Sequence, residues 1–262
     1  DIKLNKDNAP FFNSLKENTI RGQLWVSVFG GGTASTEFEA LTGNSMAFVP
    51  NGITAYTTYI NEPMQSMASL LKKQGYGMIT TGEMGIGNTT TSSAVVSAAL
   101  KLDPYLVTGR GAGLDSPGLL RKISVIRQGI LLHQPDPEDG IDILSKVGGL
   151  DLAGMAGVFL GGALYRVPIV MDGFISGAAA LMAQRICPAC AGYMLASHIS
   201  SEPAGHLLLE ALHKKAAISA GLCLGEGTGA AALMPLLDMA LRIYREMSTF
   251  KEIQIEDYKP LK

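Results

Sequence analysis

Charged residues are scarce in this chain, and neither sign dominates. They make up 17% of 262 residues, with 21 basic against 23 acidic side chains and a net charge of −2. With 47% apolar residues, this composition excludes a disordered chain and a charge-laced coiled coil. Because no run of basic residues is present, we also predict no nucleic-acid partner.

Cysteine is also rare, with three residues in the whole chain. Three cysteines are too few for the disulfide framework of a secreted domain, so we expect a reducing, cytoplasmic location. The pair Cys187 and Cys190 has CxxC spacing, but a zinc site needs about four ligands and no second such pair follows. We therefore predict no metal.

Long apolar runs free of charge or proline are missing as well. The most apolar stretch, residues 152–183, is interrupted by Arg166, Pro168 and Asp172, so a buried strand and helix fit it better than a membrane span. The N-terminal segment lacks the charged-then-apolar order of a signal peptide. No membrane association is predicted.

Glycine, in contrast, is abundant, with 31 residues and no collagen-like period. Short β-branched or apolar runs alternate with glycine-rich loops and helical patterns, which predicts an α/β fold with a mainly parallel sheet. Residues 24–29 fit either a strand or the end of an apolar helix. The other segments predicted as strands are 46–49, 76–80, 106–108, 167–172, 194–196 and 222–224. The segments predicted as helices are 33–41, 63–75, 92–100, 119–132, 139–147, 151–162, 173–185 and 230–247.

Ligands of open parallel sheets bind at the carboxyl ends of the strands. The loops expected at that edge are 82–91, 109–115, 172–176, 197–201 and 225–229.

The first of these loops reads Gly-Glu-Met-Gly-Ile-Gly-Asn-Thr-Thr over residues 82–90. Its glycines and the following helix N-terminus suit either a phosphate or ribose site or a purely structural turn. It is not a P-loop, because no lysine follows the last glycine. Glu83 would repel a phosphate, so it is better suited to ribose hydroxyls or a cationic centre.

A second glycine-rich loop, residues 109–113, can also cradle a phosphate. Lys122 on the next helix either places an ammonium over that anion or is a solvated helix charge.

Three further residues each have two interpretations. Glu226, between two glycines, is a general base or a structural acid. Asp172, at the end of a predicted strand, holds a ligand or caps the next helix. His198 is a general acid or a hydrogen-bonded structural histidine.

Longer motifs are more specific. The segments GEMGIGNTT (82–90), LHQPDPEDGIDILSKVGGLDLAGMAG (132–157) and LGEGTGAAALMPLLDMA (224–240) occur together, with MDGFISGAAALMA (171–183) and LASHISSEPAG (195–205). The chain closely resembles the nicotinate-nucleotide:dimethylbenzimidazole phosphoribosyltransferases, which act in cobalamin nucleotide-loop assembly.

The resemblance implies a three-layer α/β core over residues 30–229. It also implies a small helical second domain made from the chain ends, residues 1–29 and 230–262, and a homodimer. The implied reaction transfers the 5-phosphoribosyl group from nicotinate mononucleotide to 5,6-dimethylbenzimidazole or a similar aromatic base, without a metal or cofactor. Two alternatives are a paralogue that uses a phenolic or purine acceptor, and a catalytically weak nucleotide-binding partner subunit.

The resemblance also implies roles for individual residues. Glu226 matches the catalytic base, Glu83 is expected near the ribose C1′, and Lys122 is expected on the phosphate. The full set expected to bind substrate is Gly85, Ile86, Gly87, Asn88, Thr89, Thr90, Gly109, Gly111, Lys122, Asp172, Ser197 and Gly227.

Overall fold

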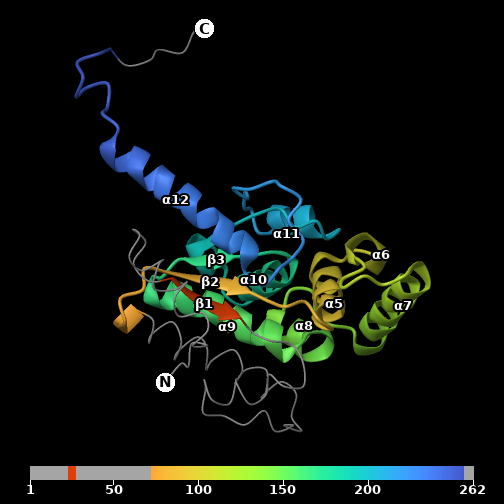
Figure 1. Cartoon of the computed structure of the whole chain (residues 1–262). Helices are drawn as coiled ribbons and strands as arrows, with labels where there is room; N and C mark the ends of the chain where they lie inside the picture. Colours follow the sequence, from red (N-terminus) through yellow and green to blue (C-terminus); the bar gives the residue numbers. More distant parts are fainter. Residues whose placement is uncertain (1–22, 28–71, 257–262) are drawn as a thin grey trace.

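The computed structural model describes residues 23–27 and 72–256, and these contain one four-stranded parallel sheet (Figure 1). The strands β1 (Gln23–Ser27), β2 (Met78–Gly82), β3 (Ile169–Met171) and β4 (Met194–Ala196) lie in that order across the sheet. The parallel sheet is therefore confirmed, and residues 23–27 form a strand rather than a helix end. The predicted elements at 33–41 and 46–49, and most of 63–75, lie outside the described residues.

Helices connect β2 to β3 and β3 to β4, and helices cover the sheet. The long predicted helices that fall within the described residues are confirmed, with ends shifted by a few residues. The helices are α5 (Asn88–Leu100), α6 (Pro104–Val107), α7 (Ser116–His133), α8 (Gly140–Val147), α9 (Leu150–Tyr165), α10 (Phe174–Ile186), α11 (Gly205–Ala211) and α12 (Thr228–Glu246), with a 3₁₀ helix at Pro188–Tyr193.

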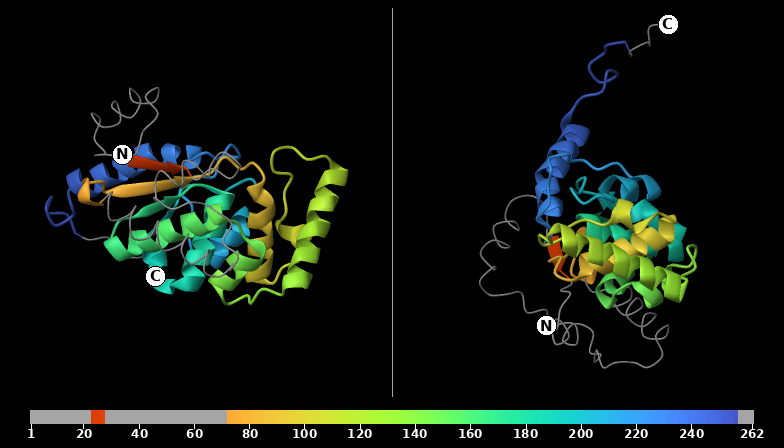
Figure 2. Two further views of the ribbon diagram at one scale, coloured as in Figure 1. Left: turned by 90° about the horizontal axis from the view of Figure 1, so that it is seen from below. Right: turned by 90° about the vertical axis from the view of Figure 1, so that its right-hand side faces the viewer.

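The sheet lies between helices on its two faces. Ile169 and Met171 of β3 pack into the main core with α9 and α10, whereas Val170 packs with Ala230 and Leu233 of α12 on the opposite face. This alternation follows from the two-residue period of a strand. Figures 1 and 2 show α12 on one side of the strands and α9 on the other.

Helix α9 is apolar all round and approaches the sheet very closely. A Cβ at Gly162 would lie 2.7 Å from Ile169 Cδ1, so a glycine is needed where α9 meets β3. The apolar stretch 152–183 thus forms α9, β3 and α10 in the protein core. None of the helices in the described part of the chain is long and apolar enough to cross a membrane.

Two predicted strands are wrong. Residues 104–107 form helix α6, because the Asp103 carboxylate caps the Tyr105 N–H at 2.8 Å and Pro104 occupies the first helical position. Residues 222–224 form an irregular segment, where the Leu222 carbonyl accepts a hydrogen bond from the Ser201 N–H at 3.2 Å. The loops 109–113 and 225–229 therefore follow a helix and an irregular segment, not strands.

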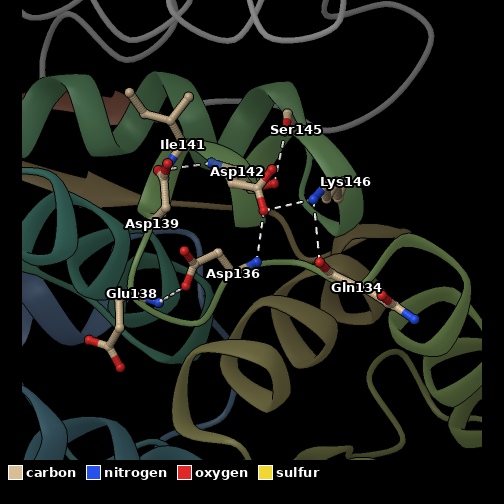
Figure 3. Close-up of polar contacts among 8 residues, drawn as sticks. All are labelled: Gln134, Asp136, Glu138, Asp139, Ile141, Asp142, Ser145 and Lys146. Carbon is tan, nitrogen blue, oxygen red and sulfur yellow. Dashed lines mark hydrogen bonds and ion pairs between the residues drawn. The ribbon is translucent and has the colours of Figure 1, made fainter.

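The connection between α7 and α8 is fixed by local hydrogen bonds (Figure 3). The Asp139 carboxylate caps α8 by accepting a hydrogen bond from the Ile141 N–H at 2.9 Å. The Asp142 carboxylate accepts a hydrogen bond from the Asp136 N–H at 2.7 Å and forms an ion pair with Lys146 Nζ at 2.9 Å. The part of the long motif between Gln134 and Lys146 thus has a structural role at this turn.

The end of β2 touches the turn before α12, backbone against backbone. The Glu226 N–H donates to the Glu83 carbonyl at 2.9 Å, and a Cβ at Gly82 would lie 2.7 Å from Gly227 Cα. A backbone cannot move aside as a side chain tip can, so only glycine allows this approach.

We therefore expect Gly82→Ala to lower the free energy of unfolding by about 1–3 kcal/mol, because the added methyl overpacks this contact. Gly77→Ala is the matched control, since a Cβ there meets nothing within 4 Å. Chemical denaturation of both variants checks this. Equal stability of the two variants would contradict the close approach.

Candidate active site

A cavity of about 590 Å³ opens at the carboxyl ends of the strands. Its walls come from the loops after β2, β3 and β4, from the loop after α6, and from the irregular segment before α12. The residues that line it fall within 83–89, 108–119, 172–176, 198–203 and 222–225. This confirms that the predicted loops meet at one edge of the sheet.

The Asp172 carboxylate is buried at the end of β3 and caps α12. Its two oxygens accept the N–H groups of Gly227 and Ala230, each at 3.0 Å. Of the two interpretations, a ligand contact or a cap on the next helix, α10, the second is wrong in its helix: the carboxylate caps α12, whose N-cap Gly227 lies 55 residues further along the chain. Burial raises the pKa of Asp172, while the backbone hydrogen bonds and the charge of His198 oppose that rise.

Ser197 and His198 lie behind this cap, and both are buried. Ser197 Oγ donates to the Asp172 carbonyl at 2.7 Å and lies 2.9 Å from His198 Nδ1. Because the hydroxyl hydrogen is used on that carbonyl, Nδ1 is the donor to the serine oxygen. Burial lowers the pKa of His198 against the opposing charge of Asp172. The imidazole also packs directly on Gly229, where a Cβ would overlap it.

Glu83 forms part of the cavity wall and is only 3% exposed. One carboxylate oxygen accepts the Met84 N–H at 2.8 Å, and the other accepts Nδ2 of Asn88 at 2.7 Å. Nδ2 of Asn88 also donates to Asp151 at 2.8 Å. Asn88, which we expected to bind substrate, therefore uses its amide N–H groups on two carboxylates.

Lys122 is buried rather than solvated, with 7% exposure. Its Nζ donates to Thr89 Oγ1 at 2.9 Å and to the Gly109 carbonyl at 3.0 Å, so it joins the N-terminus of α5 to the second glycine loop. Burial lowers the pKa of Lys122, and the charge of Glu202 opposes this effect. These bonds use two of the three N–H groups of the ammonium.

Two carboxylates near the cavity were missed from the sequence. Glu202 lines the cavity, accepts a hydrogen bond from the Gly111 N–H, and has a pKa raised by burial. A Cβ at Gly109 would lie 2.8 Å from Glu202 Cδ, so this side chain packs against the second glycine loop. Asp151 reaches the site through Asn88. Both lie within the long motifs quoted above, but no local spacing marks them.

Glu226 lies on the turn before α12, in the left-handed backbone region at φ 54°. That conformation is costly for a non-glycine residue and is found most often at functional sites. Its side chain is exposed, and Gly225 just before it lines the cavity. The turn thus places Glu226 at the edge of the cavity, bonded through its N–H to the Glu83 backbone.

The expected site residues fall into two groups. Those that line the cavity are Glu83, Gly85, Thr89, Gly109, Gly111 and Asp172. Those that are not part of the lining are Ile86, Gly87, Asn88, Thr90, Lys122, Ser197, Glu226 and Gly227.

Metal ligands do not gather in the described ranges, where no three His, Cys, Asp or Glu residues are placed to share an ion. Cys187 and Cys190 are free thiols, and burial raises the pKa of Cys190 to about 12.

Comparison with known proteins gives the family. A family model described as phosphoribosyltransferase matches residues 59–255. The chain belongs to this family. It is 48% identical, over 73% of its length, to the nicotinate-nucleotide–dimethylbenzimidazole phosphoribosyltransferase of Ruminiclostridium cellulolyticum, of which it covers 54%. This chain thus spans about half the length of the curated relatives it matches.

Solved structures agree with this family. A nicotinate-nucleotide–dimethylbenzimidazole phosphoribosyltransferase from Thermus thermophilus has a TM-score of 0.70 at 33% identity, covering 79% of this chain and 60% of that chain. CobT from the same organism has a TM-score of 0.73 at 25% identity, covering 96% of this chain and 92% of that chain. The resemblance predicted from the motifs is confirmed.

Proposed function

We propose that this chain transfers the 5-phosphoribosyl group of nicotinate mononucleotide to 5,6-dimethylbenzimidazole or a similar base, in cobalamin biosynthesis. The products are an α-ribazole 5′-phosphate and nicotinate. Family membership and the names of the relatives support this reaction. The observation that carries it is one cavity lined by the Glu83 carboxylate and by a glycine loop whose Gly109 carbonyl accepts a hydrogen bond from the buried Lys122.

The phosphate is assigned to the part of the cavity lined by Thr89 and Gly109, which Lys122 contacts from outside the lining. There the ammonium sits between Thr89 and Gly109, next to the N-terminus of α5. A helix N-terminus and a glycine loop both offer backbone N–H groups to an anion. The third N–H of Lys122 is available to a phosphate oxygen in this arrangement.

The ribose C1′ is assigned to the part of the cavity that Glu83 lines. A buried carboxylate there stabilises positive charge that develops on the sugar as the bond to nicotinate breaks. One nitrogen of the acceptor base forms the new bond to C1′, and nicotinate leaves with the electron pair of the old bond. Glu226 takes the proton from the other ring nitrogen. Attack opposite the leaving group inverts the anomeric carbon from β to α.

We also propose that the parts of the two chain ends outside the sheet core form a small helical domain, since β1 (Gln23–Ser27) and the first turns of α12 belong to the core. We further propose that the enzyme is a cytoplasmic homodimer. Apolar side chains on α12 such as Met239 and Tyr244 are exposed, and large exposed apolar patches mark interfaces. Size-exclusion chromatography with light scattering measures the molar mass of the protein in solution and checks the dimer. We expect twice the chain mass of 27.6 kDa, and a monomer would contradict it.

Glu226→Gln is expected to lower turnover by about 100-fold or more, because an amide cannot accept the acceptor's proton. Binding of nicotinate mononucleotide should change little. Nicotinate release with dimethylbenzimidazole measures turnover, and calorimetry measures binding. Glu210→Gln, an exposed glutamate on α11, is the control and should keep full activity. Normal turnover of Glu226→Gln would remove the base assignment.

The same assay with phenolic and purine acceptors separates the alternatives. Preference for one of these would identify a paralogue, and no transfer to any acceptor despite nucleotide binding would identify a partner subunit.

Lys122→Met is expected to weaken the binding of nicotinate mononucleotide by about 10- to 100-fold, since a charge-assisted bond to phosphate contributes ~1.5–3 kcal/mol. Arg121→Met is the matched control, because Arg121 is the exposed cation next to it on α7. Calorimetric titration of both variants checks this. Equal affinities for the two variants would contradict the phosphate assignment.

A further inference from the structure

Asp151 lies outside the lining of the cavity, yet it is linked to the Glu83 wall by one hydrogen-bonded side chain. It sits in the first turn of α9, 63 residues from Asn88 in sequence, and accepts Nδ2 of Asn88 at 2.8 Å. The same nitrogen donates to Glu83 at 2.7 Å. An amide nitrogen has two hydrogens, so each carboxylate takes one.

We propose that Asp151 is a positioning residue that acts through Asn88 to orient the Glu83 carboxylate. This inference rests on the proposed function, in which Glu83 faces the ribose C1′. Asp151 fixes the rotation of the Asn88 amide, and the amide in turn fixes one oxygen of Glu83.

The burial of Asn88 supports this assignment. The side chain is 5% exposed, and its carbonyl oxygen is buried without a hydrogen-bond partner among the described residues. An unpaired buried acceptor is destabilising, because it loses its hydrogen bonds to water without replacing them. Asn88 keeps this unpaired oxygen while its Nδ2 donates to two carboxylates. The function of the side chain therefore lies in its two N–H donors.

The backbone around Asp151 holds it in place. Gly149, the residue before the first turn of α9, has no side chain to cap the helix, and a Cβ there would collide with the Asp151 carboxylate. The carboxylate therefore packs over Gly149 at a helix N-terminus, where negative charge is favoured. This rigid support suits a residue that must keep a neighbour within a narrow range of positions.

A structural acid at a helix N-terminus would affect stability alone, so kinetics distinguish the two roles. Asp151→Ala removes the acceptor, and we expect kcat to fall by about 10- to 100-fold with little change in KM for nicotinate mononucleotide. Asp151→Asn should recover most of the loss, because its carbonyl oxygen can still accept from Asn88. Asn88→Ser breaks the same link from the other side and should lower kcat similarly. The control Asp142→Ala, which removes the first-turn acid of α8, should leave kcat unchanged.

Coupling to Glu83 is the decisive readout. In a Glu83→Gln background, Asp151→Ala should cause no further loss of kcat, since the two act as one unit. Independent, additive losses would overturn the inference, as would normal kcat in both Asp151→Ala and Asn88→Ser. A fully active Glu83→Gln enzyme would instead contradict the role of Glu83 in the proposed function.

Discussion

The buried carboxylate of Asp172 ties the sheet to the last helix. By accepting the N–H groups of Gly227 and Ala230, it fixes the first turn of α12 against the end of β3. Burying a carboxylate is costly, and hydrogen bonds from backbone N–H groups at a helix N-terminus offset that cost. The turn that carries Glu226 is thereby held at the edge of the cavity. Ser197 and His198 pack behind the carboxylate and complete a buried polar network.

Close backbone contacts bring the rest of the site together. Gly82 meets Gly227, Gly229 meets His198, and Gly109 meets Glu202, each at a distance that a Cβ would not allow. Loops from distant parts of the sequence thus surround one cavity with fixed walls. The buried Glu83 carboxylate lines it, and the buried Lys122 ammonium bonds to Thr89 and Gly109 of the lining. This polarity suits a nucleotide with an anionic phosphate and a sugar carbon that becomes positively charged as the ring leaves.

The sequence predicted those parts of the fold that local pattern determines. The strand at 194–196 and the long helices follow from apolar runs, helix caps and glycine stops, and they are where we expected them. The strand expected at 106–108 is wrong because three apolar or β-branched residues resemble a strand, while the preceding Asp103-Pro104 is a helix start signal. The site was predicted less completely, because its contacts join residues far apart in sequence. Two features of the site depend on tertiary packing and cannot be predicted from the residue spacing within one segment. One is the burial of Lys122, and the other is the link from Asp151 through Asn88 to Glu83.

A crystal structure with nicotinate mononucleotide bound tests the central claim most directly. The account predicts phosphate oxygens within hydrogen-bond distance of Lys122 Nζ and the ribose C1′ between Glu83 and the Gly225–Gly227 turn. A nucleotide bound outside this cavity, or inside it with its phosphate against Glu83, would contradict the account.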